Sequence, residues 1–234
     1  MHEKGSYFMN RSPLLSNAII NEDLSNLFES YSELLEMQQL YDAAIKEIRT
    51  KLDILNDEFR VRFMRNPIHH IESRLKSPHS IIKKLNRRHF EVSLASAKKN
   101  LNDIAGIRVV CCYIDDVYKV ADMLLRQGDL RLVEITDYIK QPNYNGYRSL
   151  HLDIEVPIYL AERTENVTIE VQLRTVAMDF WASLEHDLHY KTEKDIPPEI
   201  VKEMLECANE IASIDRRMQD IYKRIREIPE EKQG

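Results

Sequence analysis

Two carboxylates stand out in this sequence because the residues around them predict buried strands. Asp103 directly precedes an apolar, β-branched segment, and Glu170 lies in the middle of the alternating segment Val167–Arg174. Polar side chains fall on one face of that segment, since successive strand residues point to opposite faces of a sheet. One interpretation is a polar face turned to solvent. If the two strands lie close together, however, Asp103 and Glu170 provide the hard oxygen ligands that Mg²⁺ needs beside a bound triphosphate.

A basic segment is the second candidate for chemistry. The chain has a formal net charge of −6, yet residues 74–108 contain nine Lys or Arg and only two acidic residues. Two of these side chains share one face of a short extended segment, and three residues of the next predicted helix share one face. With the positive end of that helix, they suit a triphosphate, although a solvated basic surface is the alternative. We call these five residues the basic cradle: Arg74, Lys76, Ser80, Lys84 and Arg87.

The segment Asp137–His151 carries residues that suit the recognition of a nucleotide base. It contains tyrosine rings for stacking, amide and cationic side chains for hydrogen bonds to base edges, and a histidine at the start of the next strand. Pro142 and the pair Asn145-Gly146 are typical of turns. The segment therefore predicts a base-binding loop, unless it is an ordinary hairpin turn with surface tyrosines.

Composition excludes several other classes of protein. The five glycines fit neither GxGxxG nor GxxxxGK[ST], which excludes a Rossmann fingerprint and a P-loop, so side chains must hold any bound phosphates. Three cysteines without a CxxC pair argue against a structural zinc site and for a reducing compartment. No apolar run approaches the ~18 residues of a membrane span, and the first twenty residues do not resemble a signal peptide. We therefore expect a cytoplasmic protein.

The hydrophobic pattern predicts one α+β domain, with a central mixed β-sheet of about five strands flanked by N- and C-terminal helices. Residues 1–20 show no period and are expected to form a loose arm, followed by a helix from Glu22 to about Asn66 that Pro67 ends. The predicted strands are Ile71–Lys76, Ile107–Tyr113, Leu130–Ile139, Ser149–Val156 and Val167–Arg174. Ser77 followed by Pro78 is typical of an N-cap and the first turn of a helix. The other predicted helices are about Ser77–Arg88, Glu91–Lys99, Asp115–Arg126, Val176–Lys191 and Pro198–Arg226. This gives an N-terminal part (1–66), a catalytic core (67–191) and a C-terminal helix (192–234).

The last predicted helix carries a heptad seam, because its apolar residues recur by fours and threes. The seam consists of Ile200, Met204, Cys207, Ile211, Ile214, Met218, Ile221 and Ile225. It packs either on the N-terminal helices of the same chain or against a second copy of the chain. The pattern alone favours neither interpretation.

The order of the motifs resembles a known family. RLKSPHSIIKKLNR, DIAGIRVVCCY, DYIKQPNYNGYRSLH, IEVQLRT and FWASLEHDLHYK follow one another over about Ile71–Lys191. This order is similar to the synthetase domain of the RelA/SpoT family, in the short form of the small alarmone synthetases of the RelP/RelQ kind. The resemblance implies a nucleotidyltransferase-like synthetase fold. It also implies a Mg²⁺-dependent GTP diphosphokinase of the stringent response, which transfers the β,γ-pyrophosphate of ATP to the 3′-hydroxyl of GDP or GTP. The products would be ppGpp or pppGpp and AMP.

The resemblance also implies roles for individual residues. The five residues of the basic cradle would bind the ATP phosphates, and Arg108 would pack on adenine together with Arg74. Asp103 and Glu170 would hold Mg²⁺, and Glu170 would also act as the general base for the 3′-hydroxyl. The residues implied for the GDP/GTP pocket are Tyr147, which would stack on guanine, and Lys140, Asn145, His151 and Gln172. Many relatives have a lysine where this chain has Asn143, which leaves the preference between GDP and GTP open.

Two other functions fit the same residues less well. One is a nucleotidyltransferase that acts on RNA or protein, and the other is a nucleotide sensor without turnover, which would not need both carboxylates. His186-Asp187 is an HD doublet of the kind found in metal-dependent hydrolases, but without further ligands we expect it to have a structural role. The seam and the resemblance together predict a homotetramer, whereas RNA binding and any regulator are left open.

Overall fold

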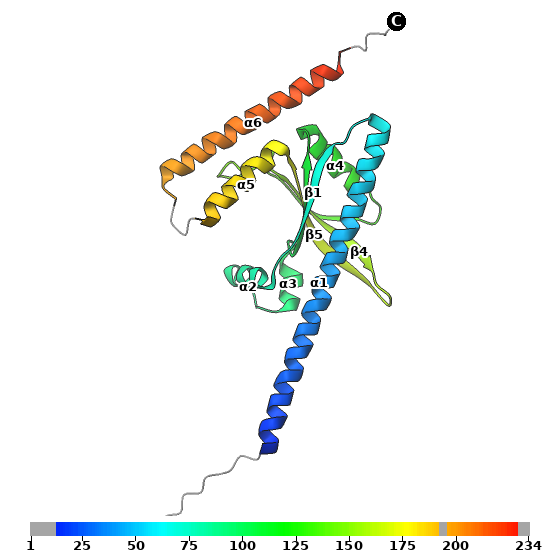
Figure 1. Ribbon diagram of the computed structural model, residues 1–234, viewed down its shortest axis with the longest axis vertical. Coiled ribbons are helices and arrows are strands. Elements are labelled where there is room, and N and C mark those ends of the chain that lie inside the picture. The colour runs from blue at the N-terminus through cyan, green and yellow to red at the C-terminus, as the bar shows by residue number, and fades with distance from the viewer. Residues whose placement is uncertain (1–12, 192–195, 229–234) are drawn as a thin grey trace, which may run out of the picture. The chain divides into compact units, whose positions relative to one another are not determined.

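The computed structural model describes residues 13–191 and 196–228 (Figure 1). The chain divides into two compact units between Gln39 and Leu40. Within the described residues, the first unit is the beginning of helix α1 (Pro13–Phe63), and the second unit holds the rest of α1, the β-sheet and the other helices. The predicted α+β class with a five-stranded mixed sheet is confirmed.

Helix α1 begins earlier than the sequence pattern predicts. The prediction of a loose arm over residues 1–20 is wrong for residues 13–20, which are helical, while residues 1–12 lie outside the described residues. Pro13 suits the first helical position because its missing N–H would have no partner there. No glycine or further proline occurs before the helix ends at Phe63, so nothing in the chain interrupts it.

The second half of α1 is held against strand β1 (Ile68–Leu75). The backbone N–H of Ile68 donates to Oδ1 of Asn56 at 3.4 Å, and Nη1 of Arg49 donates to the carbonyl of Ile71 at 3.5 Å. The apolar positions that the helical period predicts are all buried: Tyr41, Ile45, Ile48, Leu52, Leu55 and Phe59.

Five strands form one sheet in the order β1-β2-β5-β4-β3. The neighbours β2 and β5 are parallel, and the other neighbouring pairs are antiparallel. Apolar and polar residues alternate along β4 and β5 as predicted, with the apolar side chains buried. The strands after β1 are β2 (Ala105–Cys111), β3 (Arg131–Asp137), β4 (Leu150–Tyr159) and β5 (Thr164–Thr175).

Short helices flank the sheet. In α2 (Pro78–Arg87) and α3 (Leu94–Asn100), the first turn is capped by a serine hydroxyl, from Ser77 and Ser93 respectively. The cap at Ser93 explains why α3 begins later than predicted. Helix α4 (Ile114–Leu125) packs on β2 and β5 through buried residues such as Val117. Among the described helices, none combines the length and apolar composition needed to cross a membrane.

Helices α5 (Val176–Lys191) and α6 (Pro198–Arg226) have the predicted bounds, but α6 packs mainly through residues beside its seam, with the seam residue Ile211 partly buried against them. Its buried residues are Ala208, Ala212, Asp215 and Gln219. The seam residues Ile214, Met218, Ile221 and Ile225 are exposed. The alanines allow α6 to approach α5 closely, while Asp215 accepts a hydrogen bond from Thr175 Oγ1 at 2.7 Å. Packing of this part of the seam within the chain is therefore contradicted.

Candidate active site

The strand registers bring residues from all five strands, most of them polar, into two rows across one face of the sheet. In each row the residues are direct cross-strand neighbours, and the two rows are two residues apart along each strand, so their side chains share a face. One row consists of Glu72, Arg108, Gln172, His151 and Thr136. The other consists of Arg74, Gly106, Glu170, Asp153 and Glu134.

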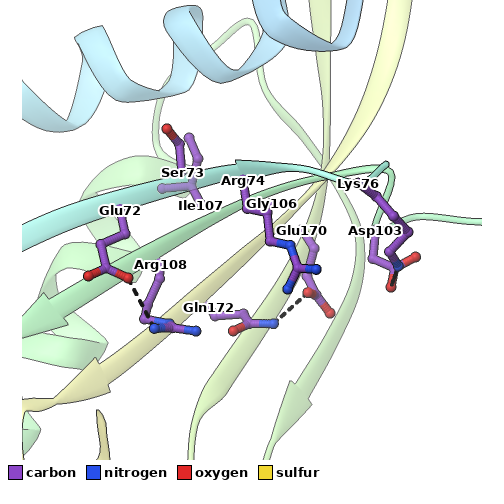
Figure 2. Close-up of a pocket in the computed structure, with 10 residues that line it drawn as sticks. All are labelled: Glu72, Ser73, Arg74, Lys76, Asp103, Gly106, Ile107, Arg108, Glu170 and Gln172. Atoms are coloured by element: carbon purple, nitrogen blue, oxygen red, sulfur yellow. Dashed lines mark hydrogen bonds and ion pairs between the residues drawn. The ribbon is translucent and has the colours of Figure 1, made fainter. Parts of the chain in front are cut away.

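The residues that β1, β2 and β5 contribute to these rows line a cavity of about 430 Å³. Asp103 and Glu170 both line it, so the prediction that two carboxylates far apart in the sequence meet in one site is confirmed. Gly106 separates Arg74 from Glu170 in its row and leaves space there because it has no side chain. Figure 2 shows the ten lining residues: Glu72, Ser73, Arg74, Lys76, Asp103, Gly106, Ile107, Arg108, Glu170 and Gln172.

Asp103 is held by two cations through one of its oxygens. Oδ2 accepts hydrogen bonds from Nζ of Lys76 and Nζ of Lys84, both at 2.5 Å. Burial alone would raise the pKa of Asp103, but the two lysines outweigh it and bring the pKa below its ordinary value. The other oxygen, Oδ1, is buried without a hydrogen-bond partner. Asp103 is thus ionised, with one oxygen left to accept a ligand.

Glu170 is also kept ionised by its neighbours. His151 Nδ1 lies 3.3 Å from Oε1, and Gln172 Nε2 donates to Oε2 at 2.6 Å, a contact drawn in Figure 2. Burial raises the pKa of Glu170, but the contacts with His151 and Gln172 bring it below the ordinary value. An ionised carboxylate in this position can accept a proton from a bound hydroxyl.

The two carboxylates fit a Mg²⁺ ion. Mg²⁺ is commonly bound through one or two carboxylates, with substrate phosphates and water as its other ligands. The unpartnered Oδ1 of Asp103 is an acceptor of the required kind, and Glu170 lines the same cavity. In the described part of the chain, no group of three or more His, Cys, Asp or Glu side chains could hold a metal ion. The HD doublet, His186 and Asp187, lies exposed on α5. The site therefore needs oxygens from a substrate to complete a metal's coordination.

Only some residues of the predicted basic cradle lie at the cavity. Arg74 and Lys76 line it, and Lys84 reaches its edge through Asp103. Ser80 and Arg87 are not among the lining residues. The Ser80 N–H is used by the helix cap, where Ser77 Oγ accepts it at 3.3 Å.

A cluster of aromatic and cationic side chains lies next to Glu170. The hydroxyl of Tyr147 lies 2.8 Å from His151 Nε2 and accepts a hydrogen bond from Arg174 Nη2 at 2.6 Å. The guanidinium of Arg174 lies 5.0 Å from the centre of the Tyr147 ring. Arg174 was not among the predicted site residues, although its alternation with Glu170 and Gln172 along β5 places it on the same face. Its burial and its partners were not readable from that pattern.

Two loop residues from the predicted acceptor pocket have other partners. Lys140 is exposed, pairs with Asp137 at 3.3 Å and lies over the ring of Tyr118. Asn145 Oδ1 accepts the N–H of Tyr147 at 3.1 Å, and its Nδ2 donates to Glu185 at 3.1 Å. In this arrangement Asn145 shapes the turn that presents Tyr147.

The same loop is attached to helix α6. Gly146 has a φ of +86°, and a Cβ at this position would lie 2.5 Å from Cβ of Ala208. Arg148 Nη1 donates to the carbonyls of Gly146 and Ala208 at 2.9 and 3.3 Å, and its Nη2 donates to Asn209 at 3.1 Å. The position of the Tyr147 loop thus depends on α6.

Residues 73–195, which include most of this site, match the family model described as a region found in RelA / SpoT proteins. The chain belongs to the RelA/SpoT family. This RelA/SpoT protein is 42% identical over 205 residues to the GTP pyrophosphokinase YwaC of Bacillus subtilis (strain 168). The aligned residues cover 87% of this chain and 96% of the relative. The resemblance seen in the motifs is confirmed.

Solved structures agree with the RelA/SpoT assignment. The crystal structure of small alarmone synthetase 2 from Bacillus subtilis matches with a TM-score of 0.74 and 41% identity, over 81% of this chain and 97% of that one. Small alarmone synthetase 1 from the same organism, bound to its product pppGpp, matches with a TM-score of 0.74 and 31% identity, over 80% and 95% of the two chains.

Proposed function

We propose that this protein is a (p)ppGpp synthetase that transfers pyrophosphate from ATP to the 3′-hydroxyl of GDP or GTP and releases AMP, as part of the stringent response. The observation that carries this proposal is the single cavity in which Asp103 and Glu170 meet Arg74, Lys76 and Arg108. Two carboxylates among cations suit the positioning of a triphosphate and the removal of a proton from a hydroxyl. The names of the relatives, which include GTP pyrophosphokinases and a structure bound to pppGpp, support it.

The cationic side of the cavity is the proposed ATP site. Arg74 and Lys76 neutralise the phosphates, and Arg108 packs on the adenine together with Arg74. Lys84 joins them, because a lysine has three donors and can bond a phosphate oxygen while keeping Asp103. Ser80 and Arg87, on the same face of α2 as Lys84, extend this surface.

The proposed acceptor site is formed by the Tyr147 loop and the adjacent strands. Tyr147 stacks on guanine, His151 and Gln172 lie between it and Glu170, and the remaining contacts come from the predicted loop residues Lys140 and Asn145. Glu170 takes the proton of the 3′-hydroxyl as the oxygen bonds to the β-phosphorus of ATP. The bond between that phosphorus and the oxygen of the α-phosphate breaks, and AMP leaves with this oxygen.

Asp103 and Glu170 are the proposed Mg²⁺ ligands. When bound, Mg²⁺ would offset the negative charge on the phosphates during transfer. The protein contributes alignment: Lys76 and Lys84 fix the direction of the Asp103 carboxylate, and His151 with Gln172 fixes that of Glu170. Alignment of this kind is a large part of catalysis in phosphoryl transfer.

An assay of the labelled products tests this function. The purified protein is incubated with Mg²⁺, GDP or GTP, and ATP labelled at the γ-phosphate, and the products are separated by anion exchange. We expect the label in the guanosine product and unlabelled AMP beside it. Label in released pyrophosphate would instead identify a nucleotidyltransferase acting on RNA or protein, and nucleotide binding without any product would identify a sensor.

We further propose that the protein assembles as a homotetramer through its C-terminal helix, residues 192–234, with residues 67–191 as the synthetase core. Support comes from exposed apolar side chains of α5 and α6 that line an open groove of about 540 Å³. Phe180, Ile214 and Met218 line this groove and are each about half exposed. Burial of such a surface against a second copy would remove apolar area from water.

A cytoplasmic location is part of the same proposal. The three cysteines, Cys111, Cys112 and Cys207, are free thiols, which suits a reducing compartment. ATP and GTP are available there as substrates.

A further inference from the structure

Asp179 lies in the first turn of α5, between two arginines that belong to different parts of the active site. Its Oδ1 accepts a hydrogen bond from Nη1 of Arg174 at 3.2 Å and lies 3.4 Å from Nη1 of Arg108. One carboxylate oxygen therefore contacts both guanidinium groups. Only 16% of the Asp179 side chain is exposed, so solvent and salt screen these contacts less than those of a surface pair.

Arg108 is the partner on the ATP side. It lines the cavity that contains Glu170, and the nitrogen that approaches Asp179 also donates to Oε2 of Glu72 at 3.1 Å. The contact between Arg108 and Glu72 is drawn in Figure 2. Two carboxylates thus hold one end of this guanidinium. A planar group must be oriented to pack on a base, so the position of Arg108 depends on both of them.

Arg174 is the partner on the acceptor side. It is buried, and within the described residues the carboxylate paired with it is that of Asp179. Its Nη2 donates to the Tyr147 hydroxyl at 2.6 Å and to Gln172 Oε1 at 3.0 Å. Because a buried cation is costly without a counter-charge, Arg174 cannot shift toward or away from Tyr147 independently of Asp179.

We propose that Asp179 is a positioning residue that couples the two nucleotide sites, so that an acceptor bound at Tyr147 orients Arg108 for ATP. This inference rests on the proposed function, which assigns Arg108 to ATP and Tyr147 to the guanosine acceptor. Both guanidinium groups draw on the same carboxylate oxygen, so a rotation of the Asp179 side chain that strengthens one contact changes the other. Closure of Tyr147 and Arg174 on a base therefore moves Asp179 and, through it, Arg108. Linkage requires that ATP strengthen acceptor binding by the same factor.

Two matched variants test this coupling. Asp179→Asn keeps the size of the side chain but removes the charge that both arginines share. Glu72→Gln removes the other carboxylate at Arg108 and leaves Arg174 untouched. The dissociation constant for ATP is measured by calorimetry with and without a GDP analogue that lacks the 3′-hydroxyl and cannot react. We expect the analogue to tighten ATP binding about fivefold or more in the unchanged protein, within the usual range of such couplings.

The variants should then separate binding from coupling. In Asp179→Asn the analogue should no longer change ATP affinity, whereas Glu72→Gln should bind ATP more weakly and keep the coupling factor. Unaltered coupling in Asp179→Asn would overturn the proposal, and so would equal loss of coupling in both variants. Should circular dichroism show that Asp179→Asn is unfolded, Arg174→Lys replaces it. A lysine keeps the charge but lacks the planar fork that bonds Asp179, Tyr147 and Gln172 together, so coupling should fall.

Failure of this inference can be distinguished from failure of the proposed function. If the unchanged protein forms no labelled guanosine product from GDP or GTP, the proposed function is wrong and this inference is overturned with it. If product forms normally while the analogue changes ATP affinity equally in the unchanged protein and in Asp179→Asn, the coupling role of Asp179 alone is wrong.

Discussion

At the scale of single residues, both carboxylates of the site are held in place by hydrogen bonds or ion pairs to neighbouring side chains. Asp103 is bound by Lys76 and Lys84 through one oxygen only, and Glu170 has one partner on each oxygen. Side chains held in this way need little reorganisation when a substrate enters, which lowers the entropy lost on alignment. Substitutions at these positions should therefore affect turnover more than folding.

Glu170→Gln is the most direct test of the proposed base. Glutamine keeps the size of the side chain but cannot take a proton, so kcat should fall by about 10²–10⁴-fold. Binding of ATP, measured by calorimetry, should be retained because the cationic residues are unchanged. Glu165→Gln, a partly exposed position near the start of the same strand, is the matched control and should keep full activity. Unchanged turnover in Glu170→Gln would rule out the assigned role.

The pH dependence of the reaction depends on His151. The pKa of Glu170 lies below its ordinary value because His151 and Gln172 outweigh burial, so the base stays ionised as the pH falls through the usual range of glutamate. Activity should be lost only below that range. In His151→Gln the ion-pair partner is absent, the pKa of Glu170 rises, and the acidic limb of the profile of kcat/KM should move to higher pH.

The control for this profile is His69→Gln, at an exposed position of β1 outside the cavity. It should leave the acidic limb where it is in the unchanged protein. An acidic limb in His151→Gln that coincides with that of the control would contradict the electrostatic role of His151.

At the scale of elements, the registers of β1, β2, β5 and β4 explain why residues distant in the sequence share one cavity. A shift of one residue in any pairing would turn its polar side chains to the opposite face. The alternation along these strands was readable from the sequence, and so was the cap of α2. The start of α1 was not, because its first two turns lack an amphipathic pattern and are helical all the same.

The contact between the Tyr147 loop and α6 can be tested with Gly146→Ala. A side chain at φ +86° is strained, and its Cβ would lie 2.5 Å from Cβ of Ala208. Because such strain costs about 1–3 kcal/mol, the loop should be displaced and the KM for the acceptor raised about tenfold, while the KM for ATP changes little. Steady-state kinetics with each substrate varied in turn measure this difference.

Gly128→Ala provides the comparison, since a Cβ there meets no atom within 4 Å. It should have the kinetic constants of the unchanged protein. Equal effects of Gly146→Ala on both KM values would show that the loop does not act on the acceptor alone.

At the scale of the whole molecule, charge and apolar surface are concentrated in different places. The net charge of −6 coexists with a cavity where Arg74, Lys76 and Arg108, with Lys84 at its edge, stand against three carboxylates, so anionic substrates meet more positive charge there than over the protein in general. The exposed apolar residues of α5 and α6 lie outside this cavity. Assembly through them would leave the cavity open to its nucleotides.

A double substitution in α6 tests the proposed assembly. Ile214→Glu with Met218→Glu places charges on the exposed seam, where burial without a partner is costly. Light scattering should show a tetramer for the unchanged protein and a smaller species for the variant. Ser213→Glu, an exposed position of α6 outside the seam, should remain tetrameric. A monomer for the unchanged protein would contradict the proposal.

The sequence by itself determined what depends on neighbours along the chain. Strand alternation placed Glu170 and Gln172 on one face, the serine cap located α2, and the motifs at Asp103 and Tyr147 identified the family. These features follow from local backbone geometry and need no knowledge of distant contacts.

Only the tertiary structure decided how the strands pair and which face of α6 is buried. Strand pairing brought Asp103 and Glu170 into one cavity. The packing of α6 buried its alanines and left much of its seam exposed. The tertiary structure also brought Asp179 to Arg108, which lies far from it in the sequence. Such contacts depend on loop closure and on the burial of charge over long distances in the chain, for which a heptad or a strand period carries no information.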